Sequence, residues 1–287
     1  LSEDGAIIQS GVLAPVDLEP GQSTAIDIPY AQLRVTPGAV YFLRLEFALR
    51  ADELWAKRGH IIAWEQMSLP FAATAAPMAT ASSPLLVDES GDDVRISGKG
   101  FDLAFDKKQG TITRLVYDNQ EVIASDAFVS RIRRGRRRPE MVAHGNGPLP
   151  NFFRAPVDND LQFGRGAGAR WRTMELWDVT HKADNVKVNE TDGQRVDISL
   201  DMVSTAAKGY SVKSTIHYAI QGNGCIDVTS TFTPDALDIP LPRLGMQMEL
   251  PKGMEYVEWL GRGPHENYWD RKRSADLGRY RKTVTEM

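Results

Sequence analysis

The chain has 287 residues, of which 42% are hydrophobic and 25% are charged, and its formal net charge is −4 at pH 7. This length suffices for one large or two ordinary domains, and the acidic balance gives no general attraction to nucleic acid or to acidic membranes. No apolar run approaches the roughly 18 residues that a membrane-spanning helix needs. The single cysteine, Cys225, excludes an internal disulfide and a cysteine-ligated zinc site, and its alternating surroundings predict a buried structural thiol.

The first 70 residues alternate between apolar and polar side chains, which is typical of β-strands. Residues 1–8 predict a hairpin that turns at Glu3-Asp4-Gly5, and the odd positions from Tyr41 to Leu49 are apolar. Two further strands are predicted, one at His60–Leu69 and one around Ile26 and Ile28. A small β-sandwich is therefore predicted for residues 1–70.

No strand precedes the first hairpin, and no capping pattern follows at Met287. We therefore expect the chain to be a piece of a longer protein. A sandwich that lacks its opening strands leaves strand edges unpaired, so we expect copies to associate, or the region near Leu1 to be disordered.

Residues 71–84 are rich in Ala, Ser, Thr and Pro and predict an extended linker between two domains. Alternation resumes in the second domain, residues 85–287, where strands are predicted at Phe101–Phe105, Ile112–Tyr117, Val196–Leu200, Val212–Ile220, Ile226–Phe232 and Met246–Leu250. Gly222-Asn223-Gly224 is a strong hairpin signal. One short helix is predicted from Trp171, Met174 and Trp177, which are spaced by three. The predicted fold class is all-β, with a large antiparallel two-sheet sandwich in the second domain.

Residues 147–160 read GPLPNFFRAPVDND and concentrate prolines, carboxylates and one guanidinium in a short stretch. Asp158, Asn159 and Asp160 can close turns onto nearby backbone amides, and Arg154 can hold a carboxylate through two parallel hydrogen bonds. Two interpretations stay open. The segment is a rigid corner whose polar groups satisfy one another, or some of these groups contact a polar ligand such as a sugar.

The next stretch, residues 162–169, contains three glycines and predicts a mobile loop of the kind that closes over a site. It lacks the strand-before, helix-after context of a dinucleotide-binding loop. A second motif, WLGRGPHENYWDR, occupies residues 259–271, with a tight turn predicted at Gly261, Gly263 and Pro264. His265 beside Glu266 could act as an acid/base pair, but neighbours in an extended chain point to opposite faces, so hydrogen bonding or sugar contact is expected instead.

Other catalytic and binding patterns are weak. The five histidines are scattered without metal-ligand spacing, and no pair of carboxylates can be placed at the separation that glycoside cleavage requires. Residues 131–138, RIRRGRRR, hold six arginines. A solvated hairpin or a surface that meets carboxylates of another domain is expected there, and nucleic-acid binding is the alternative.

These motifs resemble those of a known family. GPLPNFFRAPVDND looks like a signature of the C-terminal region of LacZ-type β-galactosidases, glycoside hydrolase family 2, and WLGRGPHENYWDR resembles a second signature of that region. KRGHIIAWEQMSLP, residues 57–70, is similar to the end of the sandwich domain before it. The resemblance implies an immunoglobulin-like sandwich at residues 1–70 that lacks its opening strands, and a galactose mutarotase-like supersandwich at residues 85–287 that lacks its last part.

The resemblance also implies a role. In this family the two catalytic glutamates lie on a TIM barrel that precedes this region, which makes the chain a non-catalytic part of an enzyme that hydrolyses terminal β-D-galactosyl groups with retention. The expected partners are that barrel, the galactoside and further copies of the enzyme, and the family's Mg²⁺ and Na⁺ are expected to bind outside this chain. The candidates for the rim of the substrate site are Arg154, Asp158, Asn159, Asp160, Gln162, Phe163, Arg165, His265, Glu266 and Asn267. A free-standing sugar-binding or mutarotase-like protein that uses His265 and Glu266 is the alternative.

Overall fold

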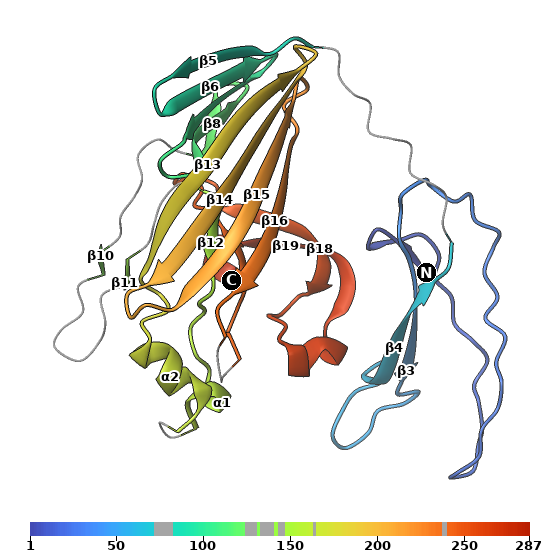
Figure 1. The fold of residues 1–287 in the computed structure, drawn as a ribbon. Helices are drawn as coiled ribbons and strands as arrows, with labels where there is room; N and C mark the ends of the chain where they lie inside the picture. The colour runs from blue at the N-terminus through green and yellow to red at the C-terminus, as the bar shows by residue number, and fades with distance from the viewer. Residues whose placement is uncertain (72–82, 124–130, 133–140, 143–146, 163–164, 237–239) are drawn as a thin grey trace. The chain divides into compact units, whose positions relative to one another are not determined.

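The computed structural model describes residues 1–71, 83–123, 131–132, 141–142, 147–162, 165–236 and 240–287 (Figure 1). The chain forms two compact units. Unit 1 comprises Leu1–Ala79 and Met254–Met287, and unit 2 comprises Thr80–Gly253. The sequence-derived limits of 1–70, 71–84 and 85–287 stay a prediction, because these units are defined by spatial contacts and most of the predicted linker lies outside the described residues.

Unit 1 contains a four-stranded antiparallel sheet in the order β2-β1-β3-β4. Its strands are β1 (Ser2–Glu3), β2 (Ala6–Ile7), β3 (Tyr41–Ala48) and β4 (Ile61–Leu69). The predicted hairpin at the N-terminus is confirmed, with Asp4 and Gly5 in its turn at φ 47° and 80°. The predicted strand around Ile26 and Ile28 is wrong. A strand exchanges backbone hydrogen bonds with a neighbour, and among the described residues the segment forms no such ladder.

The second part of unit 1 is the hairpin of β18 (Tyr256–Gly263) and β19 (Asp276–Thr283), joined through the 3₁₀ helix η2 (Trp269–Ser274) and followed by η3 (Val284–Glu286). The tight turn predicted at Gly261 and Gly263 is wrong, because both glycines lie within β18. A Cβ on Gly263 would lie 2.7 Å from the Tyr280 ring, which stacks at 5.4 Å on Trp259. The glycine therefore makes room for an aromatic pair rather than for a turn.

Unit 2 is built mainly from two antiparallel sheets (Figure 1). The first is the meander β5 (Leu86–Ser90), β6 (Asp93–Gly98), β7 (Phe101–Asp106), β8 (Thr111–Tyr117) and β9 (Gln120–Ile123). The second has the longest strands, β13 (Val179–Thr191), β14 (Arg195–Ala206), β15 (Ser211–Gln221) and β16 (Ile226–Pro234). The remaining strands are β10 (Arg131–Ile132), β11 (Met141–Val142), β12 (Leu149–Asn151) and β17 (Gly245–Gln247), with β10 paired to β11 and β12 to β17.

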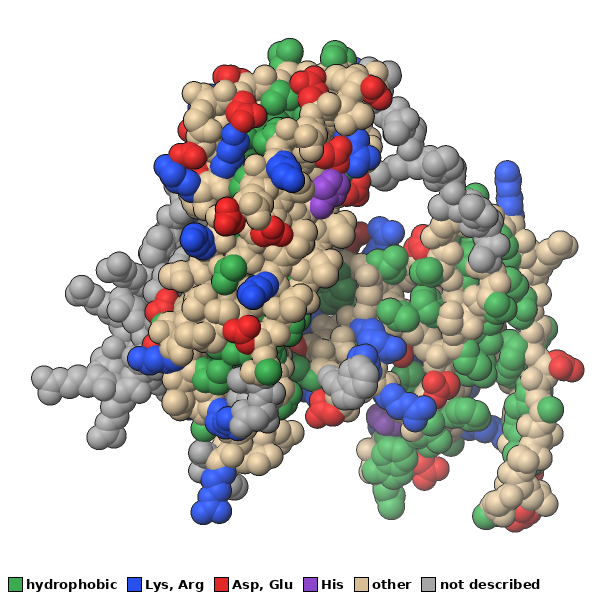
Figure 2. Space-filling view, in the orientation of Figure 1, with side chains coloured by type: hydrophobic (Ala, Val, Ile, Leu, Met, Phe, Trp, Pro, Cys, Tyr) green, Lys and Arg blue, Asp and Glu red, His purple; other side chains and the backbone are tan. Residues whose placement is uncertain are grey.

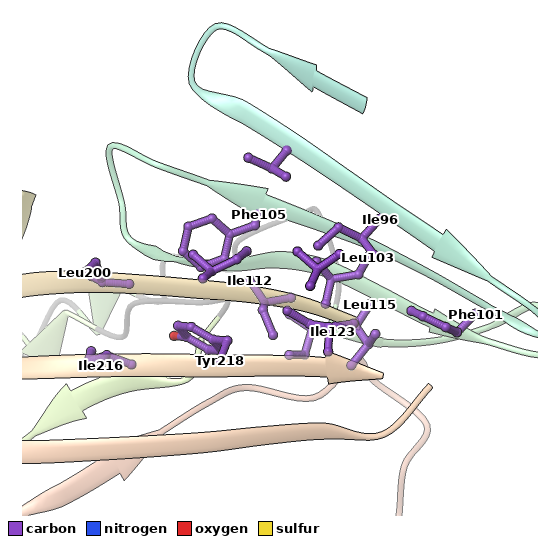
Figure 3. Close-up of a cluster of buried hydrophobic side chains, with 14 of the residues drawn as sticks. Ile96, Phe101, Leu103, Phe105, Ile112, Leu115, Ile123, Leu200, Ile216 and Tyr218 are labelled. Carbon is purple, nitrogen blue, oxygen red and sulfur yellow. The ribbon is translucent and has the colours of Figure 1, made fainter. Parts of the chain in front are cut away.

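The two large sheets enclose the main core of unit 2 (Figure 3). Side chains of the meander, including Leu103 and Phe105, face Leu200 and Tyr218 of the longer strands. Phe105 and Tyr218 meet edge to face with ring centroids 5.4 Å apart. This confirms the predicted all-β class and the two-sheet sandwich, since the alternating apolar positions of each strand are the ones that the core buries.

Two local predictions in unit 2 differ from the structure. The strand expected to run from Met246 to Leu250 ends at Gln247, and Met248 and Leu250 are half exposed. Cys225 is only partly buried and lies between the Gly222–Gly224 turn and β16, where its backbone N–H donates to Asn223 Oδ1 at 2.9 Å. The alternating pattern thus extends three residues beyond the end of β17 and one residue before the start of β16.

Helices are few. α1 (Asp158–Leu161) and α2 (Ala167–Thr173) are the α-helices of the described residues. The predicted helix therefore exists, but it starts earlier and ends before Met174, so Trp177 lies beyond it. Among the described residues, none of the helices has both the length and the apolar character that crossing a bilayer requires.

Candidate functional site

The first motif enters unit 2 through a tightly packed glycine. Gly147 has φ 124°, and a Cβ there would lie 2.7 Å from the Gln247 carbonyl oxygen. The chain then forms β12 against β17 and buries Phe152 completely. Phe152 meets Tyr210 edge to face at 5.9 Å in a second core cluster that also holds Trp171. The polar residues of the motif are thus flanked by buried groups, Phe152 before them and Trp171 after them.

Arg154 and Asp160 form the centre of the polar segment. The guanidinium donates to both carboxylate oxygens, from Nη1 at 2.6 Å and from Nη2 at 3.1 Å. The backbone N–H of Val157 donates to Asp160 Oδ2 at 2.8 Å, which fixes the start of α1. The Arg154 guanidinium holds the pKa of Asp160 below its usual range, with burial opposing and the Val157 N–H assisting. We call this doubly hydrogen-bonded pair of Arg154 and Asp160 the Arg154–Asp160 strut. It agrees with the interpretation of the segment as a rigid corner whose polar groups satisfy one another.

Arg154 also lies over the face of Trp171 in α2, with Cζ 5.4 Å from the ring centroid. The indole Nε1–H of Trp171 donates to the Pro240 carbonyl oxygen at 2.9 Å, and the ring is almost fully buried. One guanidinium therefore links α1 to α2 through a carboxylate and an aromatic face. The sequence predicted Trp171 only as a helix position, because no local pattern connects it to a residue 17 positions earlier.

The glycines that follow α1 serve close packing. Gly166 is buried, and a Cβ on it would lie 2.1 Å from the Asp160 carbonyl oxygen. On Gly168 a Cβ would lie 3.1 Å from the same oxygen and from Pro156 Cβ. Residues 167–169 lie in α2, so the prediction of an open mobile loop over 162–169 is wrong for this part. Phe163 lies outside the described residues.

Four rim candidates stand on this frame with exposed side chains: Asp158, Asn159, Gln162 and Arg165. Asp158 and Asn159 occupy the first turn of α1, and Gln162 ends it in the left-handed region at φ 37°. The Arg154–Asp160 pair thus fixes the start of the helix that carries Asp158 and Asn159, and Gln162 follows at its end. Polar side chains on a rigid frame can hydrogen-bond a neutral polyol without reorganising.

The remaining candidates lie in unit 1 after β18. Both ring nitrogens of His265 face backbone carbonyl oxygens, Nδ1 that of Glu266 at 2.7 Å and Nε2 that of Ser274 at 3.0 Å. The carboxylate of Glu266 is exposed and lies 3.9 Å from Arg271. Asn267 is exposed. A neutral imidazole has one N–H, so one of these nitrogens donates to its carbonyl oxygen and ties His265 to the backbone of the turn.

Among the described residues, no three His, Cys, Asp or Glu side chains lie close enough together to hold a metal ion. The carboxylate at the centre of the segment, Asp160, is already engaged by Arg154. Most of the arginine run at 131–138 lies outside the described residues, and its role stays a prediction.

Two family models match the chain. The model described as "Beta galactosidase small chain" matches residues 97–287, which is more than half of the chain. The model described as "Beta-galactosidase, domain 4" matches residues 1–70. The two candidate motifs of residues 147–160 and 259–271 both fall within the first match.

The most similar curated proteins that we compared are also β-galactosidases. The chain is 29% identical to a β-galactosidase of Priestia megaterium over 86% of this chain and 21% of the relative. It is 28% identical to the β-galactosidase of Vibrio cholerae over 95% of this chain and 25% of the relative. The β-galactosidase of Psychromonas ingrahamii matches all of this chain at 28% identity over 27% of its own length.

The chain therefore spans about a quarter of the length of these curated relatives. The motif resemblance, the two family matches and the all-β structure agree with one another: this chain belongs to the β-galactosidase family and corresponds to the C-terminal region of LacZ-type enzymes.

Proposed function

We propose that this chain is the non-catalytic C-terminal part of a β-galactosidase that hydrolyses terminal β-D-galactosyl groups with retention. The proposal rests on the matches of residues 97–287 and 1–70 to β-galactosidase models, together with the coverage of about a quarter of the relatives' length. In the candidate segment, the central carboxylate of Asp160 is paired with Arg154. Because the pKa of Asp160 is lowered, this carboxylate is ionised at neutral pH and has no proton to donate as a general acid.

The strut gives the segment a different task. It presents Asp158, Asn159, Gln162 and Arg165 at the surface of unit 2 with a fixed backbone. We propose that these side chains form part of the rim of the substrate site and hydrogen-bond sugar hydroxyls, while a TIM-barrel domain supplies the acid/base and nucleophile groups. Mg²⁺ and Na⁺ are proposed to bind to that domain, and the complete enzyme to be a homo-oligomer.

The mutarotase-like alternative receives less support. It requires His265 to exchange a proton with a sugar ring, but both ring nitrogens contact backbone carbonyl oxygens of the turn. A histidine in that position stabilises the turn before η2. We therefore keep sugar contact, and not catalysis, as the proposed role of His265, Glu266 and Asn267.

The rim is tested by Asp158→Ala and Asn159→Ala in a β-galactosidase that contains this region. Loss of one neutral or charged hydrogen bond to substrate should raise KM about two- to tenfold, with kcat changed by less than about twofold. Lys213→Ala, at an exposed position of β15, is the control and should change neither constant. Unchanged KM in both variants would remove the rim proposal, and a large fall in kcat at constant KM would show a catalytic role instead.

A further inference from the structure

The hairpin of β18 and β19 falls within the match to the small-chain model, yet in space it belongs to unit 1 with the first 79 residues. The start of β19 makes the contacts. The carboxamide of Gln66 in β4 donates from Nε2 to the Leu277 carbonyl oxygen at 2.7 Å and accepts from the Leu277 N–H at 2.8 Å. One side chain thus engages both backbone polar groups of Leu277, as a paired residue on an antiparallel strand would.

Asp276 makes the second contact. Its carboxylate is 13% exposed, pairs with Arg44 of β3 and accepts a hydrogen bond from Trp64 Nε1 at 3.3 Å. The Arg44 guanidinium also lies over the Trp64 ring, with Cζ 5.5 Å from the centroid. Arg44 lies opposite Gln66 across β3 and β4, and Trp64 is two residues before Gln66, so all three share one face of the sheet.

A glycine makes the third contact. A Cβ on Gly5, in the turn between β1 and β2, would lie 2.1 Å from the Arg279 backbone nitrogen and 2.7 Å from the Gly278 carbonyl carbon. No larger residue fits between this turn and β19. Residues 276–279 therefore contact the N-terminal sheet at each position, and we call this set of contacts the β19 joint.

Hydrogen bonds determine where the joint forms. Figure 2 shows many hydrophobic side chains at the surface of residues 1–70, among them Leu54 and Trp55. Apolar contact is non-directional and does not select one position on such a surface. The hydrogen bonds of Asp276 and Leu277 are directional, and a shift of β19 by one residue, about 3.4 Å, would break them.

The joint lies beside the loop that carries the second group of rim candidates. The Ser274 carbonyl oxygen, two residues before Asp276, faces Nε2 of His265 at 3.0 Å. Arg262 Nη1 donates to the carbonyl oxygen of Ala275 at 2.8 Å, and Ala275 is buried. Both ends of the loop are thus tied to backbone that directly precedes the joint.

We propose that residues 1–70 position the loop of residues 264–275 through the β19 joint, and that Gln66 is a positioning residue for the rim candidates of this loop. The effect on substrate rests on the proposed rim function. The effect on the loop does not, because amide hydrogen exchange measures local order without reference to activity.

The test introduces Gln66→Leu into a β-galactosidase that contains this region, which removes both hydrogen bonds and keeps a side chain of similar size. Gln9→Leu is the matched control, because the Gln9 carboxamide forms the same two hydrogen bonds with Ala31, at 3.1 and 2.8 Å, and among the described residues none with β19. Deuterium exchange of residues 264–275 is followed by mass spectrometry, with the strands β13–β16 as the internal reference for a folded unit 2. The constants kcat and KM are measured with nitrophenyl β-D-galactoside.

We expect the amides of the loop to exchange about tenfold or more faster in Gln66→Leu, with KM raised about two- to tenfold and kcat changed by less than about twofold. Gln9→Leu should change none of these. A second pair of variants tests the same joint. Gly5→Ala should also accelerate exchange in the loop, whereas Gly21→Ala, at a similar φ of 84° with open space around it, should not.

Unchanged exchange of the loop in Gln66→Leu would overturn the proposal. An equal acceleration in Gln9→Leu would also overturn it, because the effect would then be a general loss of stability. Faster exchange of the loop with an unchanged KM would support the joint and remove the rim role of the loop instead.

Discussion

The Arg154–Asp160 strut should contribute measurably to the stability of unit 2, and a double-mutant cycle isolates its contribution. Arg154→Met keeps an apolar stem over Trp171 and removes the guanidinium, and Asp160→Asn keeps an acceptor for the Val157 N–H and removes the charge. The two side chains are 22% and 15% exposed and share two hydrogen bonds. Exposed pairs contribute about 0–1 kcal/mol and broken buried pairs cost about 3–5 kcal/mol, so we expect a coupling energy of about 2 kcal/mol.

The assay is urea unfolding followed by circular dichroism. With a slope of roughly 2 kcal/mol per molar urea, the coupling corresponds to a midpoint shift of about 1 M. The control cycle uses Arg114 and Asp102 of the same unit, which share one contact at 2.7 Å and are 39% and 47% exposed. We expect a coupling below about 1 kcal/mol for this control pair. A coupling at 154/160 no larger than at 114/102 would refute the role of the strut.

The strut also predicts a pH dependence. Because Arg154 lowers the pKa of Asp160 in the folded chain, the contribution is complete above the unfolded carboxyl pKa of about 3.9. It is lost as the pH falls through the lower folded pKa. The coupling energy should therefore be constant from neutral pH down to the mildly acidic range and disappear in stronger acid, and a coupling that vanishes at neutral pH would contradict the assignment.

Three further outcomes follow from the packing of unit 2. Gly166→Ala should destabilise by about 1–3 kcal/mol because its Cβ would lie 2.1 Å from the Asp160 carbonyl oxygen, whereas Gly245→Ala, whose Cβ would meet only Arg243 Nε at an ordinary 3.9 Å, should be close to neutral in urea unfolding. Phe105→Ala should cost about 3–5 kcal/mol in the same assay, and a loss below 1 kcal/mol would contradict the core assignment. Burial raises the pKa of Tyr218 to about 12, so its stabilising effect is complete below pH 10 and lost as the pH rises through about 12. Ultraviolet titration of wild type against Tyr218→Phe should show this late-ionising phenol, and its absence would place Tyr218 at the surface.

Strands could be predicted where alternation coincides with burial on one face. Phe101, Leu103 and Phe105 are such a set, and the structure buries all three. Residues 26–28 show the same local pattern, but a strand exists only where another strand pairs with it, and a sequence window contains no information on that partner. The limits of α2 were mispredicted for a related reason, since Trp177 owes its position to Phe153, whose ring lies 5.5 Å away and 24 residues earlier.

Some features of the candidate site could likewise be predicted from the sequence, and others could not. The pair of Arg154 and Asp160 is six residues apart, so its chemistry could be anticipated from the sequence. The part played by Gly166 could not, because three glycines in a short stretch are typical of flexible loops, and only the close approach of α2 to the Asp160 carbonyl explains this one. The placement of His265 between two backbone carbonyls depends on Ser274, nine residues later, and the sequence left it as one of several interpretations.

The most direct test of the account measures hydrolysis of nitrophenyl β-D-galactoside by the purified 287-residue chain, with circular dichroism to establish that it is folded and a full-length β-galactosidase as the positive control. The account predicts no release of nitrophenol above the buffer rate at any chain concentration. Release that increases in proportion to the chain, and that Glu266→Gln abolishes, would place the bond-breaking groups within these residues and contradict the account.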